Sequence, residues 1–208
     1  MARYIGARCR LCRREGEKLF LKGSKCNTEK CPLVRRNYIP GQHSQKKTKL
    51  SNYGLQLREK QKVKRMYGIL ERQFRHYFNI ARKAGGVTGK VLLQLLERRL
   101  DNVIFRLGLA TSRAQARQIV RHNWIYVNSR RVNIPSYLVN KGDTIALKTK
   151  ENVKRAIENN LELTKEREIP GWLQWNKDTF TANVLRLPDR EDIVQPIKEH
   201  LIVELYSK

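Results

Sequence analysis

The uneven distribution of charge limits what this chain can fold into. Lys and Arg outnumber Asp and Glu by 44 to 19 among the 208 residues, which gives a formal net charge of +25. The net charge is +20 for residues 1–100, +7 for 101–150 and −2 for 151–208. A compact state with so much positive charge repels itself unless a polyanion neutralises it. We therefore expect residues 1–150 to meet a polyanion, and the last quarter to serve folding or protein contacts.

Hydropathy narrows the class of protein further. Hydrophobic residues make up 40% of the chain, enough for real cores, so the chain is not simply a disordered basic tail. No stretch approaches the ~18 apolar residues of a transmembrane helix. Residues 1–14 have no apolar run typical of a signal peptide. We expect no membrane partner and a cytoplasmic protein in a reducing compartment, whether in a bacterial cytosol or in an organelle.

All the cysteines fall in the first 31 residues, as two close pairs: Cys9, Cys12, Cys26 and Cys31. Two such pairs can place four thiolates around one tetrahedral ion, and the flanking Lys and Arg residues favour the thiolate form. The spacing predicts one structural Zn²⁺ held by all four cysteines, whose binding drives folding of a segment too small for its own core. An iron–sulfur cluster, free thiols and disulfides are the alternatives, of which disulfides suit a secreted chain.

The middle of the chain has a helical pattern. Apolar residues recur every three or four positions from about residue 55 to 84, which predicts one long helix ended by Gly85 and Gly86. A second helical pattern covers residues 89–107. The preceding stretch, 37–54, is a basic linker, and three of its residues are candidate RNA contacts: Lys46, Lys47 and Lys49.

Beyond residue 111 the spacing of the apolar residues changes from a helical period to a short helix followed by strand-like alternation. Ser112 and Gln115 form a capping-box pair that predicts a short helix to about residue 122. Alternating apolar residues then predict short, hairpin-like strands around 125–132 and 145–147. We expect a helix over 152–163, a strand near 180–187 and a final apolar run at 201–205.

The short helix carries a basic stripe, because Arg113, Arg117 and Arg121 are spaced at i, i+4 and i+8 on one face. No acidic residue lies between Asp101 and Asp143, so we expect these arginines to have no local salt-bridge partner. Guanidinium groups match phosphate oxygens well, so the stripe is a candidate phosphate-binding face.

Two further arginines, Arg130 and Arg131, lie at the predicted turn and could extend this surface. A helix face beside a short hairpin suits RNA, which is read largely by shape and backbone. The charge alone does not exclude DNA.

Several motifs together resemble one known family. ERRLDNVIFRLGLATSRAQARQIVRHNWIYVNSRRVNIPSYLVNKGDTIALKT, starting at residue 97, resembles the small RNA-binding module named after small ribosomal subunit protein S-four. Some RNA-modifying enzymes share that module. PGQHSQKKTKLSNYGLQLREKQK at 40–62, the following KRMYGILERQF and the terminal LIVELYSK resemble the S-four family itself. The resemblance runs essentially from end to end; the terminal motif departs only conservatively from the more usual Phe and Arg version.

The resemblance implies a primary binder of small-subunit rRNA, in its 5′ domain, that acts early in assembly. It also implies a place near the site where mRNA enters, contact with protein S-five, a role in decoding accuracy and, in some relatives, repression of the protein's own mRNA. The family's RNA-facing helix matches residues 112–121, which implies RNA contacts for Arg113, Gln115, Arg117 and Arg121. Many relatives lack the cysteines, so the zinc prediction depends on this chain having all four.

Two other classes of protein were weighed against this one. An RNA-modifying enzyme would need a catalytic domain, yet the four histidines are scattered and no Ser/His/Asp or glycine-rich phosphate signature occurs. A free-standing regulator of mRNA or tRNA would have the same composition, and only the full-length resemblance or co-sedimentation with small subunits separates it. We therefore expect a non-enzymatic ribosomal protein.

We predict an α+β fold in three parts. Residues 1–45 are expected to form the four-cysteine zinc segment and basic linker. Residues 46–90 are expected to form a mainly helical domain completed by 180–208. Residues 91–179 are expected to form the RNA-binding module of helices followed by short antiparallel strands.

Overall fold

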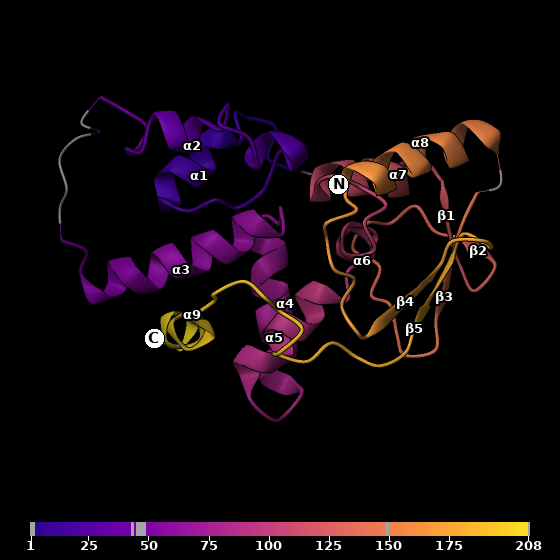
Figure 1. Cartoon of the computed structure of the whole chain (residues 1–208). Coiled ribbons are helices and arrows are strands. Elements are labelled where there is room, and N and C mark those ends of the chain that lie inside the picture. Colours follow the sequence, from indigo (N-terminus) through magenta and orange to yellow (C-terminus); the bar gives the residue numbers. More distant parts are fainter. Residues whose placement is uncertain (1–2, 43, 45–48, 149, 208) are drawn as a thin grey trace. The chain divides into compact units, whose positions relative to one another are not determined.

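The computed structural model describes residues 3–42, 44, 49–148 and 150–207. The described residues form helices and one antiparallel sheet, which confirms the predicted α+β class (Figure 1). The chain divides into two compact units. The first contains Met1–Leu92 and Gln195–Lys208, and the second contains Leu93–Val194.

The N-terminal segment of the first unit is built from short helices: α1 (Cys9–Glu15), η1 (Gly23–Cys26) and α2 (Pro32–Arg35). Buried ion pairs connect it to the long helix that follows. The carboxylate of Glu15, 2% exposed, accepts hydrogen bonds from Arg58, at 3.4 Å, and from Arg65. Burial raises the pKa of Glu15, while the guanidinium groups of Arg65 and Arg58 act in the opposite direction. The segment is thus held to its own unit by paired charges as well as by apolar contacts.

The prediction of one long helix over 55–84 is wrong, because two helices occupy this stretch: α3 (Asn52–Met66) and α4 (Glu71–Lys83). The break falls at Gly68, whose φ of 65° is a left-handed conformation that suits glycine. Apolar spacing continues across the break, so periodicity alone did not reveal it. Both helices bury aromatic or aliphatic residues, including Val63 on α3 and Phe74 on α4, each 0% exposed.

The C-terminal helix, α9 (Glu199–Tyr206), completes the first unit (Figure 1). Its Tyr206 ring stacks on Phe78 with centroids 4.5 Å apart, and its Glu204 accepts a hydrogen bond of 2.8 Å from Gln56. We expected the whole of 180–208 to complete the helical domain. Residues 181–184 instead form a strand in the sheet of the second unit, because their alternating burial fits a sheet face.

The second predicted helix is also two helices, α5 (Thr88–Glu97) and α6 (Leu100–Arg106). They are separated at Arg99, which is extended and forms a backbone bridge with Leu138. The guanidinium of Arg99 pairs with Asp101 at 2.7 Å. Every residue of α6 is buried, so its polar residues are paired inside the unit.

The sheet of the second unit has the order β2-β1-β3-β5-β4, with every neighbouring pair antiparallel. The predicted strands are present as β1 (Ile125–Val127), β3 (Thr144–Leu147) and β5 (Thr181–Val184), with the two-residue β2 (Arg130–Arg131). β4 (Leu173–Asn176) was not predicted, although Leu173 and Trp175 alternate with polar residues. The helices α7 (Arg113–Arg121) and α8 (Glu151–Leu163) also belong to this unit, and both were expected from the sequence.

Candidate nucleic-acid interface

The helix α7 begins at the predicted cap. The backbone N–H of Gln115 donates to Oγ of Ser112 at 3.3 Å. The side chain of Gln115 faces the protein as well: its Oε1 accepts from the N–H and hydroxyl of Thr111, each at 2.7 Å, and its Nε2 donates to Asn160 of α8 at 3.0 Å. Gln115 therefore fixes α7 to its neighbours, and its amide is already hydrogen-bonded within the unit.

Two arginines of the predicted stripe have partners inside the second unit. The guanidinium of Arg113 lies 4.4 Å from the ring centroid of Phe105, and its Nε donates to Asn102 at 2.8 Å. Arg117, whose side chain is only 12% exposed, lies 3.5 Å from the carboxylate of Asp101. The expectation that the stripe lacks a local salt-bridge partner is therefore wrong for Arg117. The fold brings α6, with its acidic residue, against α7, which spacing along the chain does not show.

Arg121 is the exposed member of the stripe, and no ion pair of its side chain is found in the described part of the chain. Arg130 and Arg131 are exposed as well, on β2. The turn between β1 and β2 uses Asn128 and Ser129 in left-handed conformations, with φ of 49° and 64°. Successive strand residues point to opposite faces, so only one of the β2 arginines can share a surface with any given neighbour.

The sequence reading missed a basic face on α4. Arg72, Arg75, Arg82 and Lys83 are all exposed, and their spacing places them on the side of the helix opposite the buried aromatic residues. Within the described ranges, none of the four makes an ion pair. The sequence contains the signal, because these basic residues are spaced on the side of the helix opposite its apolar stripe. We call these four residues the α4 basic face.

The expected linker contacts are only partly described. Lys49 is exposed, as an RNA contact requires. Lys46 and Lys47 lie outside the described residues.

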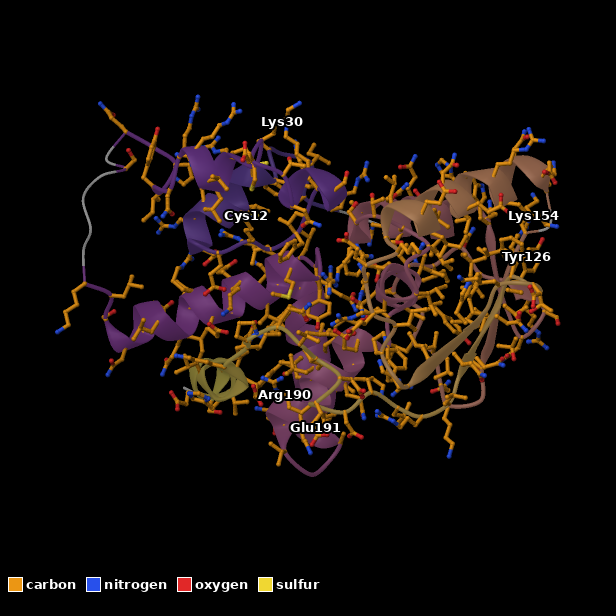
Figure 2. All side chains as sticks on the ribbon, in the orientation of Figure 1. Cys12, Lys30, Tyr126, Lys154, Arg190 and Glu191 are labelled. Carbon is orange, nitrogen blue, oxygen red and sulfur yellow. The ribbon has the colours of Figure 1, made fainter. Side chains whose placement is uncertain are left out.

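The four cysteines line one small hollow in the N-terminal segment, together with apolar and lysine residues. Figure 2 labels Cys12, which lies on α1. The backbone N–H of Lys22 donates to Sγ of Cys26 at 3.4 Å, and all four cysteines are free of disulfides. Among the described residues, no three or more His, Cys, Asp or Glu side chains are grouped closely enough to hold an ion.

Burial raises the pKa of Cys12 and of Cys26, and the other thiols of the cluster add to the effect. Our expectation that the flanking Lys and Arg residues favour the thiolate is therefore wrong for these two cysteines. Desolvation of the thiolate outweighs the effect of the basic neighbours. A bound cation would stabilise the thiolate forms of Cys12 and Cys26.

Two family models match adjacent parts of the chain. The model described as "Ribosomal protein S4/S9 N-terminal domain" matches residues 3–97, and the "S4 domain" model matches residues 98–145. The chain is also 61% identical, over 208 residues and 100% of both chains, to small ribosomal subunit protein uS4 of Thermoanaerobacter sp. (strain X514). The chain belongs to the uS4 family. Proteins of the same name from Acetivibrio thermocellus and Trichlorobacter lovleyi are 60% and 59% identical to it, again over the full length of both chains.

Membership of the uS4 family confirms the family predicted from the sequence motifs, and with it the prediction that the chain is not an enzyme. This is a family of structural ribosomal proteins, and its second matched region is an RNA-binding domain. In the described part of the chain, no helix is both long and apolar enough to span a membrane.

Proposed function

We propose that the protein is a structural constituent of the small ribosomal subunit that binds small-subunit rRNA. The observation that carries this proposal is the α4 basic face, four exposed cations without an acidic partner among the described residues. Arg121 and the exposed arginines of β2 provide basic surface on the second unit. The full-length similarity to proteins named small ribosomal subunit protein uS4 supports RNA of that subunit as the polyanion.

The physical basis is the release of counterions. Each Lys or Arg that neutralises an RNA phosphate frees condensed cations, which favours binding and makes it sensitive to salt. An arginine already held by partners inside the unit gains less, because the phosphate must compete with those partners. We therefore assign the phosphate contacts to Arg121 and the α4 basic face, and a positioning role to Arg113 and Arg117, which hold α7 against α6.

The finer function follows the family resemblance. We propose that the rRNA contact is in the 5′ domain, that binding occurs early in assembly, and that the protein supports decoding accuracy near the site where mRNA enters. The near-neutral last quarter, with exposed Glu158 and Glu162 on α8, suits a neighbouring protein such as S-five better than RNA. Repression of the protein's own mRNA would use the same basic surfaces.

Sedimentation of tagged protein in cell lysate tests the proposal. The protein should travel with small subunits at physiological salt, and be found there in about one copy per subunit. Protein that remains free of subunits, yet is recovered with mRNA or tRNA, would instead support a free-standing regulator.

We further propose that the four cysteines hold one structural Zn²⁺. Thiolates are ligands that zinc prefers, and four of them leave no open position for catalysis. The support is that all four thiols line one hollow and that a backbone N–H is directed at Cys26. When bound, the ion would stabilise the thiolates and fix α1, η1 and α2 to one another.

A further inference from the structure

Between α7 and α8 lies a hollow of about 320 Å³, which we call the α7–α8 hollow. Its rim carries Gln118 and His122 from α7, Asn159 from α8, and Trp124 just beyond α7. Figure 1 shows the two helices of the second unit, and the hydrogen bond from Gln115 to Asn160 joins them at the inner end of the hollow.

The lining of the hollow has both polar and aromatic groups. No Asp, Glu, Lys or Arg lines it, and the buried Ile119 forms part of its wall. The ring of Trp124 lies edge-on to His122, with centroids 6.3 Å apart and planes at 71°. Glu158 and Glu162 project from other sides of α8 by helical geometry, so they do not oppose an RNA ligand at this place.

Two exposed amides of the rim remain available for a ligand. The amides of Gln115 and Asn160 are bonded inside the unit. In contrast, the side chains of Gln118 and Asn159 are exposed and make no hydrogen bond to the described residues. Side-chain amides can donate to and accept from the edge of one nucleobase at the same time.

The hollow also lies next to a phosphate-binding group. At 100° per residue, Gln118 and His122 are the next side chains around α7 from Arg121, on the side away from its buried face. A phosphate held by Arg121 would therefore bring its attached nucleoside to the rim. Unpaired bases of RNA commonly leave the stack and lie against aromatic side chains in this way.

We infer that the α7–α8 hollow takes one unpaired base of the bound RNA. The inference rests on the proposed rRNA binding. It adds a site on the protein that recognises an unpaired base of the rRNA. The volume is near the lower limit for small-molecule pockets, which is enough room for one base. Trp124 and His122 supply the stacking surface, and Gln118 and Asn159 supply the hydrogen bonds to the base edge.

The test uses two hollow variants and a matched control, all in the full-length protein. Gln118→Leu and Asn159→Leu each remove one amide from the rim. Asn152→Leu makes the same exchange at an exposed position two turns earlier on the same side of α8, outside the hollow. Affinity for purified small-subunit rRNA is measured for each, together with the chemical reactivity of unpaired bases at their Watson–Crick edges.

We expect wild-type protein to protect one unpaired base, and both hollow variants to restore its reactivity. Loss of one or two hydrogen bonds should weaken binding about 2- to 10-fold, with the control unchanged. Equal affinity and equal protection in all proteins would overturn the inference, while the proposed rRNA binding would stand. If the hollow variants bind rRNA normally but their subunits lack a neighbouring protein, the hollow binds that protein and not a base. Failure of wild-type protein to bind rRNA at all would remove the proposed function itself.

Discussion

The hydroxyl of Tyr206 donates a hydrogen bond of 2.8 Å to Oε1 of Glu71, which joins the last turn of α9 to the start of α4. The same carboxylate accepts bonds from Lys60 at 2.8 Å and Lys64 at 2.9 Å, both on α3. The consecutive helices α3 and α4 and the distant α9 thus meet at one carboxylate. The core of the first unit therefore depends on the C-terminal helix.

Tyr206→Phe should lower the free energy of unfolding of the first unit by about 1 to 2 kcal/mol, because a charged hydrogen bond is lost while the ring stays. Hydrogen exchange measured by peptide should show the loss of protection in α9 and α4. Tyr53→Phe is the control, since Tyr53 is 57% exposed and lies on the same unit. Unchanged protection in the Tyr206 variant would mean that the ring contact with Phe78 alone holds the helix.

The pH dependence of stability should reflect Glu71. Burial acts to raise the pKa of this carboxyl, but hydrogen bonds from Lys60, Lys64 and Tyr206 outweigh it and hold the pKa at about 2. Because the folded value is below the ordinary 4.5, the stabilisation is fully present above pH 4.5. It is lost as the pH falls from about 4.5 to 2, and Glu71→Gln should flatten the stability curve in that window. A variant that loses stability with pH as steeply as the wild type would contradict this assignment.

The carboxylate of Glu97 is 1% exposed and holds the guanidinium of Arg106 through two bonds, of 2.9 and 2.7 Å. Glu97→Gln should destabilise the second unit by about 3 to 5 kcal/mol, because it leaves a buried cation unpaired. Tryptophan fluorescence during urea unfolding measures this, since all three tryptophans lie in the second unit. The double variant with Glu97→Leu and Arg106→Met should recover much of the loss. A double variant as unstable as the single one would show that shape rather than charge is decisive.

The sequence predicted the fold class, the cap at Ser112 and the helix α8, because these depend on local pattern and on short-range hydrogen bonds. It did not predict the breaks at Gly68 and Arg99, where the apolar pattern continues although the backbone turns. Gly68 alone did not predict the break, because glycine also occurs inside helices that continue past it. The extended conformation of Arg99 depends on its bridge to Leu138, a contact distant in sequence.

The candidate interface was predicted in the same uneven way. Spacing correctly placed Arg113, Arg117 and Arg121 on one helix. Their exposure differs, because only Arg121 is exposed to solvent. Arg113 and Arg117 are held by α6, and only the folded chain brings their partners within reach. The α4 basic face could have been found from the spacing of Arg72 and Arg75, because both lie opposite the apolar stripe.

Removal of metal should affect only part of the protein. We expect chelation to release one Zn²⁺ per chain and to make residues 3–36 sensitive to protease, while the second unit stays protected. Cys26→Ser should have the same effect without chelator. Metal analysis of protein purified under reducing conditions is the direct measurement. Absence of zinc, with this segment still protected, would contradict the proposal.

The salt dependence of rRNA binding tests the central claim most directly. We compare wild-type protein with a variant in which Arg72, Arg75, Arg82 and Arg121 are replaced by Ala. Each lost phosphate contact should reduce the slope of log affinity against log salt by roughly 0.7 to 0.9, or about 3 in all. Arg155→Ala is the control, because Arg155 is 73% exposed but paired with Glu151 at 3.3 Å. The account predicts a shallower slope in the quadruple variant alone, and an unchanged slope in that variant would contradict it.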